Sequence, residues 1–180
     1  MSNLVFRARP LSTAAIGATA DQVREVLGLR DVRYVPVPEV LELLLPKALE
    51  GYVFRVGEHE ELQECHGQTR PDEREICLRD DVYQRMIGGA GRDRLTGCHE
   101  IGHLVLHQTP YLARRIGEQP LKAFEDPEWQ ANCFAGSLLM PERFFREAGS
   151  VAVAIEMFGV TADAARHRMR QLKLGWEGVK

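Results

Sequence analysis

The stretch His99-Glu100-Ile101-Gly102-His103 constrains the fold of this chain more than any other part of the sequence. Residues four apart lie about one turn apart on the same face of an α-helix, so a helix here presents both imidazoles to one metal ion. Glu100 follows the first histidine directly, and its carboxylate can reach a water on the metal without binding the metal. Two ligands and one base are what zinc-assisted amide hydrolysis requires. The stretch therefore predicts a helix that carries a metal site.

A hydrolytic zinc site takes a third ligand from the protein and leaves the fourth position to water. His107 continues the four-residue spacing, but each step of four turns about 40° around the helix. A third histidine on the same straight helix does not converge on one ion, so we interpret His107 as a packed or supporting side chain. A longer motif with its third histidine at position 109 is also excluded, because Thr109 stands there.

A carboxylate on a second helix is the remaining source of a third ligand. Glu128 and Asn132 share a helix face because they lie four residues apart, so Glu128 could bind the metal while Asn132 hydrogen-bonds a ligand. Glu118 and Glu125 are alternatives without such a partner. If this stretch stood alone, the favoured interpretation of Glu128 would be a solvated acid in the first helical turn after Pro127.

Two separated stretches resemble the ImmA/IrrE-like metallopeptidases. The segment from Arg92 to Leu104 looks like the active-site helix of that family. The segment from Glu128 to Pro141 has the family's form E-x-x-A-N, then F-A, then L-L-M-P. The resemblance covers Gly67 to Pro141 well and the ends of the chain loosely. One departure is Gly97-Cys98, where the family has more helix-favouring apolar residues.

The resemblance implies a zinc-dependent metalloendopeptidase. Carried over residue by residue, His99, His103 and Glu128 would bind zinc, and Glu100 would be the general base. The implied biology is the regulatory cleavage of a repressor or another DNA-binding regulator, although no residue identifies that substrate. The alternative is a regulatory binding module that keeps the metal site but acts by docking a partner.

The composition excludes several other classes. A chain of 180 residues fits one domain, and its 23 basic and 26 acidic residues give a net charge of −3, without a global nucleic-acid signature. Residues 1–20 do not resemble a signal peptide, and no stretch approaches the roughly 18 apolar residues of a membrane span. Cys65, Cys77, Cys98 and Cys133 lack C-x-x-C pairing, which indicates reduced thiols in a cytoplasmic protein. Cys98 and Cys133 lie close to proposed ligands, so a cysteine-ligated site is a further alternative.

The spacing of apolar residues predicts an α+β fold, and the resemblance makes it zincin-like: a small sheet packed with helices and followed by a helical tail. Helices are expected from a capping box at Thr19 to Gly28, from Pro38 to a break or bend at Pro46, and over residues 81–86 before a glycine turn at 88–91. A short extended piece is expected at 34–37, and strands are expected at 52–56, 62–67 and 75–79. The edge of this sheet could hold an extended peptide by strand addition.

We divide the chain into a loosely ordered N-terminal arm (1–18), a metallopeptidase core (19–141) and a helical tail (142–180). In the tail, Thr161 is expected to cap a helix that carries Arg166, Arg168, Arg170 and Lys173. This pattern resembles half of a helix-turn-helix. The acidic total and the missing third helix argue against DNA binding, so we interpret the four cations as a solvated face.

The connection between the two motif helices could form a wall or lid of the cleft, since it contains Pro110, Gly117 and Pro120. Tyr111, Arg114 and Arg115 lie in it and are candidates for contacts with a protein or peptide substrate. The alternative for these three is an ordinary surface position.

Overall fold

The computed structural model describes residues 6–108, 113–114 and 122–176. Its helices are α1 Thr13–Val26, α2 Val37–Glu39, α3 Leu45–Ala48, α4 His59–Leu62, α5 Asp80–Ile87, α6 Gly91–Leu106, α7 Pro127–Leu139, α8 Glu142–Ala148, α9 Val151–Phe158 and α10 Ala162–Gln171. Its strands are β1 Phe6–Arg7, β2 Val53–Gly57, β3 Gly67–Arg70, β4 Glu75–Arg79 and β5 Ala113–Arg114. The predicted α+β, zincin-like class is confirmed. Within the described ranges, no helix is long and apolar enough to cross a membrane.

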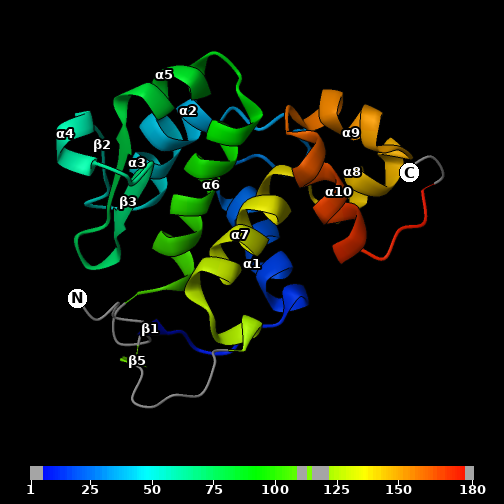
Figure 1. Cartoon of the computed structure of the whole chain (residues 1–180), viewed down its shortest axis with the longest axis horizontal. Coiled ribbons are helices and arrows are strands. Elements are labelled where there is room, and N and C mark those ends of the chain that lie inside the picture. Colours follow the sequence, from blue (N-terminus) through cyan, green and yellow to red (C-terminus); the bar gives the residue numbers. More distant parts are fainter. Residues whose placement is uncertain (1–5, 109–112, 115–121, 177–180) are drawn as a thin grey trace.

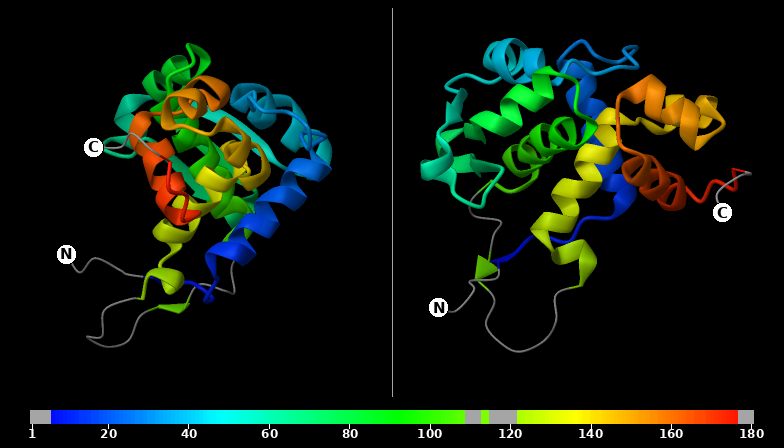
Figure 2. Two further views of the ribbon diagram at one scale, coloured as in Figure 1. Left: turned by 90° about the vertical axis from the view of Figure 1, so that its right-hand side faces the viewer. Right: turned by 45° about the horizontal axis from the view of Figure 1, so that its top comes forward.

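Helix α6 runs through the middle of the molecule (Figure 1). The small sheet and helices α2 to α5 lie on one side of it, and α7 and α1 lie on the other. Helices α8, α9 and α10 follow beyond α7, and the two further views show the same arrangement (Figure 2). Buried residues from all these parts form one hydrophobic cluster, which includes Ile76 of β4, Ile101 of α6 and Phe158 of α9.

The small sheet has the strand order β2-β4-β3, with β2 parallel and β3 antiparallel to β4. The strands expected at 52–56 and 75–79 are confirmed within one residue. The strand expected at 62–67 was wrong, because Leu62 ends α4 and the strand begins at Gly67. The extended piece expected at 34–37 forms no strand, and it leads as expected into a helix, α2, which begins at Val37 with Pro38 in its first turn.

Two glycines allow α6 to lie close to its neighbours. A Cβ on Gly102 would lie 3.1 Å from the Cα of Ala131 in α7, and a Cβ on Gly97 would lie 3.0 Å from both Met86 and Val37. Gly102 belongs to the first sequence motif and Ala131 to the second, so the two motifs touch where each has a small residue. This contact brings the end of one motif helix beside the start of the other.

The first long helix begins seven residues earlier than its capping box predicted. Helix α1 starts at Thr13, and the hydroxyl of Ser12 caps it by accepting a hydrogen bond from the Ala15 amide (3.1 Å). Thr19 lies inside the helix, where its hydroxyl donates to the Ala15 carbonyl, so residues 13–18 do not belong to a loose arm. The expected bend near Pro46 takes the form of a π-helical segment, Val40–Leu44, just before α3.

Three buried arginines join the helical layers by donating to backbone carbonyls. Arg24 bonds the carbonyl of Leu138, Arg94 bonds that of Phe158 and lies over the Tyr34 ring, and Arg168 bonds that of Met140 (3.0 Å). Arg168 is only 4% exposed, so the interpretation of the tail cations as one solvated face was wrong at this position. Burial lowers the pKa of all three guanidinium groups.

Candidate metal centre

Three side chains converge at the contact between α6 and α7. The Nε2 atoms of His99 and His103 lie 2.9 Å apart, and the two carboxylate oxygens of Glu128 lie 3.2 Å from His99 Nε2 and 3.3 Å from His103 Nε2. Each histidine side chain is 18% exposed, whereas that of Glu128 is 67% exposed. Among the described residues this is the group of histidine, cysteine and acidic side chains whose ligand atoms could hold a metal ion.

Asn132 determines which nitrogen of His99 faces the centre. It lies one turn after Glu128 on α7, and its Oδ1 lies 3.1 Å from His99 Nδ1. An amide oxygen only accepts hydrogen bonds, so His99 Nδ1 carries the proton and donates it. The opposite nitrogen, Nε2, therefore presents a lone pair to the centre.

A chain of hydrogen bonds determines which ring nitrogen of His103 faces the centre. The Gln130 amide nitrogen donates to the carbonyls of Arg9 and Phe124 (both 2.8 Å), so its Oε1 accepts from His107 Nε2 (3.0 Å). Burial lowers the pKa of His107 to about 4, which keeps the ring neutral and makes its Nδ1 an acceptor. His103 Nδ1 donates to that atom (2.9 Å) and leaves its own Nε2 lone pair directed at the centre. His107 is thus a supporting side chain, as its spacing indicated.

This donor set fits a divalent metal. Two ligand atoms that each lie about 2.0–2.1 Å from a tetrahedral ion are about 3.3 Å apart, which agrees with the distances from Glu128 to the two histidines. Two imidazole lone pairs and a carboxylate repel one another at this range unless a cation lies among them. Neutral imidazole and carboxylate are common zinc ligands.

A proton is the alternative occupant of this centre. Hydrogen bonds from His103 and then His99 hold the pKa of the Glu128 carboxyl far below its usual range. Burial disfavours the charged form of His99, but its bond to Glu128 and the charges of Glu100 and Glu128 together raise its pKa. The centre therefore favours positive charge, and metal binding must displace protons from it.

Glu100 lies beside this centre but does not belong to the converging group. Its side chain is buried, and its Oε2 accepts a hydrogen bond from the Thr69 hydroxyl on β3 (2.6 Å). Gly67 on the same strand leaves room for it, because a Cβ there would lie 3.0 Å from the Glu100 Cγ. The sheet thus orients the carboxylate. Sequence reasoning missed Thr69, Gly67 and Gln130, since only the strand pairing and the helix contact bring them to the site.

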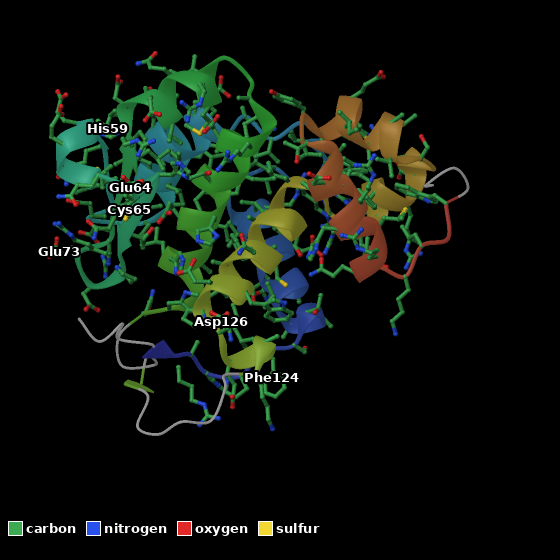
Figure 3. The ribbon with its side chains drawn as sticks, viewed as in Figure 1. His59, Glu64, Cys65, Glu73, Phe124 and Asp126 are labelled. Atoms are coloured by element: carbon green, nitrogen blue, oxygen red, sulfur yellow. The ribbon has the colours of Figure 1, made fainter. Side chains whose placement is uncertain are left out.

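The centre opens into a cleft of about 590 Å³ between the sheet and the two motif helices. Strand β3 contributes Gly67 to Thr69 to its wall, His66 lies just before this strand, and α6 contributes the exposed Arg92. Figure 3 shows Cys65, another residue of this wall, on the sheet side, and Asp126 at the start of α7. In the described part of the chain β3 pairs with β4 alone, so the other edge of β3 has free backbone groups.

The rival ligands considered from the sequence do not converge on the centre where the structure describes them. Glu125 is ion-paired with Arg7 (2.6 Å), and Cys133 accepts a hydrogen bond from Gln171. Cys98 is fully buried, and its burial raises the pKa of its thiol to about 12. Glu118, Tyr111 and Arg115 lie outside the described residues. The Arg114 backbone pairs with Phe6, and its side chain also lies outside them.

The hydrogen-bond chain behind His103 leads to a prediction for Gln130→Leu. The substitution removes the acceptor that holds His107 in one tautomer, so His103 loses its orientation. We expect the affinity for zinc to fall about 10-fold, within the range typical of groups that orient a ligand. A competitive zinc titration measures this effect, with unfolding of the metal-free variant as the control for lost packing. An unchanged zinc affinity would contradict the proposed orienting role.

Comparisons with known proteins agree with this geometry. Residues 89–170, which contain both motif helices, match the Peptidase M78 family model, described as the IrrE N-terminal-like domain. The structure is similar to that of a Mycobacterium tuberculosis transcriptional regulator, with a TM-score of 0.59 and 16% sequence identity over 91% of this chain and 49% of that chain. This chain spans about half the length of that regulator, and at this identity the likeness shows a shared fold. No curated protein matched the sequence significantly. The match over residues 89–170 supports the resemblance of this chain to the ImmA/IrrE-like, or M78 peptidase, family.

Proposed function

We propose that this chain is a zinc-dependent endopeptidase whose ligands are His99, His103 and Glu128 and whose general base is Glu100. The observation that carries the proposal is the convergence of two imidazole lone pairs and a carboxylate beside a buried glutamate that another element orients. This is the arrangement of a hydrolytic site with one ligand position left to water. The match to a peptidase family supports the same reaction class.

A zinc ion bound by His99, His103 and Glu128 would act as a Lewis acid and would lower the pKa of a nucleophilic water to about 7. Glu100 would accept a proton from a water molecule as the oxygen of that water attacks the scissile carbonyl carbon. It then transfers the proton to the amide nitrogen, which leaves as an amine when the C–N bond breaks. The Thr69 hydroxyl, at 2.6 Å from the carboxylate, keeps Glu100 in the orientation that both transfers need.

The substrate is, in this proposal, a protein segment in extended conformation. The free edge of β3 lies along the cleft, where a peptide can add as a further strand and bring a backbone carbonyl to the centre. The family resemblance supports a repressor or another DNA-binding regulator as the protein that is cut. The fold shared with a transcriptional regulator agrees with a role in gene regulation. The four cysteines are free thiols, which is consistent with the cytoplasm.

A substrate trap tests this proposal. We expect zinc-loaded Glu100→Gln to retain from a cell lysate a protein that the wild type cuts at one peptide bond. The wild type acting on the captured protein, followed by mass spectrometry of the new termini, gives the cleavage site. A captured protein that the wild type leaves intact would support instead a module that acts by docking.

A further inference from the structure

The cleft at the metal centre continues into a second hollow, which we call the α7–α10 groove. This groove has a volume of about 490 Å³ and is lined by α7, by α10 and by Leu95 of α6. Leu95, Asn132 and Thr161 line both the cleft and the groove. A chain held at the centre can therefore continue past Asn132 into the groove without leaving the surface.

The lining of the groove combines an apolar floor with a basic rim. Trp129 is half-buried in it, and Cys133, Met140 and Ala164 add further apolar surface. On the rim, His167 and Arg170 are exposed and lie three residues apart on α10. The one acidic side chain among the lining residues, Asp163, is already paired with Arg166 (3.3 Å). Neither His167 nor Arg170 has a side-chain ion pair within the described ranges.

Gly136 keeps part of the groove open. It lies inside α7, and a Cβ added there would meet nothing within 4 Å. Its backbone is helical, so neither backbone conformation nor packing requires glycine at this position, although glycine is less favourable than alanine in a helix interior. A larger side chain at position 136 would enter the groove, while the helix itself could form unchanged.

We propose that the α7–α10 groove is a subsite for the protein substrate and that it takes an apolar side chain followed by an acidic one. The apolar side chain packs on Trp129, and the carboxylate pairs with Arg170 and His167. The inference rests on the proposed peptidase function, because it takes the chain that enters the groove to be the substrate. The volume of the groove is within the range of about 300–1,000 Å³ that is usual for ligand pockets.

Binding of labelled peptides tests the subsite separately from cleavage. The probes are fluorescein-labelled ten-residue peptides on an alanine-rich frame, with Leu or Gly at one position and Glu or Lys at the next. Their affinities for zinc-loaded Glu100→Gln are measured by fluorescence anisotropy. We expect the Leu-Glu peptide to bind most tightly, and we expect Gly136→Leu to weaken it about 10-fold by filling the groove. Arg170→Glu should weaken it by a similar factor and shift the preference toward the Leu-Lys peptide.

Matched controls separate this effect from a change in folding or net charge. Gly17→Leu makes the same substitution at another helix-interior glycine where a Cβ meets nothing within 4 Å, and Gly136→Ala adds only a methyl group. Lys173→Glu makes the same charge change as Arg170→Glu at an exposed position outside the groove. All three controls should bind the Leu-Glu peptide as the parent protein does.

Two results would overturn the subsite. The first is an affinity for the Leu-Glu peptide that Gly136→Leu does not lower, or lowers no more than the control variants do. The second is equal binding of all the peptides, or no binding of any of them. The proposed function fails separately. If the wild type cuts no protein while Gly136→Leu still loses peptide binding, the groove is a binding site without the peptidase reaction. If Gly136→Leu cuts the trapped substrate at the wild-type rate and site, the reaction remains and the subsite is wrong.

Discussion

Glu100→Gln is expected to lower kcat for the trapped substrate by about 10²–10⁴-fold while the protein keeps its fold and its zinc. The amide has nearly the shape of the carboxylate, so it fits the space that Gly67 leaves and can accept the Thr69 hydrogen bond through its oxygen. It cannot take a proton from water at neutral pH, and loss of a general base has an effect of this size. The effect should appear in kcat with little change in KM, because substrate contacts are unaltered.

Glu156→Gln is the matched control for this prediction. It makes the same change at an exposed glutamate on α9, outside the cleft. Rates are compared at equal zinc content, measured by metal analysis, so that lost metal is not mistaken for a lost base. Wild-type turnover by zinc-loaded Glu100→Gln would show that another group takes the proton.

Glu128→Ala is expected to weaken zinc binding by more than about 100-fold. Loss of a group that only orients a ligand costs about 10–100-fold in affinity, and loss of a ligand should cost more. The negative Glu128 carboxylate also favours positive charge at the two histidines, as the lowered pKa of Glu128 and the raised pKa of His99 indicate. The Glu128 side chain is 67% exposed, so its removal should leave the stability of the metal-free protein nearly unchanged. A competitive titration with a chromogenic chelator measures the affinity.

Glu125→Ala provides the comparison for Glu128→Ala. Glu125 is the rival carboxylate that the structure describes, and it lies three residues before Glu128, where it pairs with Arg7. Its loss should cost some stability and leave the zinc affinity unchanged. The reverse pattern, with zinc lost in Glu125→Ala and kept in Glu128→Ala, would refute the ligand assignment.

The sequence predicted the parts of the site that depend on short-range spacing. A four-residue step brings His99 and His103 together on one helix face, and the same step places Asn132 beside Glu128. These relations depend only on helix geometry. The family resemblance then implied that the two motif helices supply ligands to one metal. The close contact between Gly102 and Ala131 shows how these helices come together at the site.

The remaining features depend on contacts between residues far apart in the chain. Thr69 reaches Glu100 only because β3 pairs with β4 in one register, and Gln130 reaches His107 only because α7 lies against α6. Gln130 is two residues from Glu128, about 200° around the helix, so local spacing placed it away from the site. Arg168 looked like one more surface cation, and only the packing of α10 shows its bond to the Met140 carbonyl.

Errors in the elements have a related physical cause. The sequence around Thr19 satisfies a capping pattern, but Ser12 caps the same helix about two turns earlier, and packing of Ile16 in the core stabilises the longer helix. The acidic run before Cys65 forms the short helix α4 in place of the start of a strand. In both places tertiary packing outweighed a local preference.

Zinc K-edge X-ray absorption of the wild-type protein reconstituted with one equivalent of zinc tests the central claim most directly. The proposed centre predicts a first shell of nitrogen and oxygen at about 2.0–2.2 Å, with outer-shell scattering from two imidazoles and no sulfur. In Glu100→Gln the same spectrum is expected, because Glu100 is not a ligand. A sulfur shell at about 2.3 Å would identify Cys98 or Cys133 as a ligand and contradict the assignment, and so would scattering from three imidazoles.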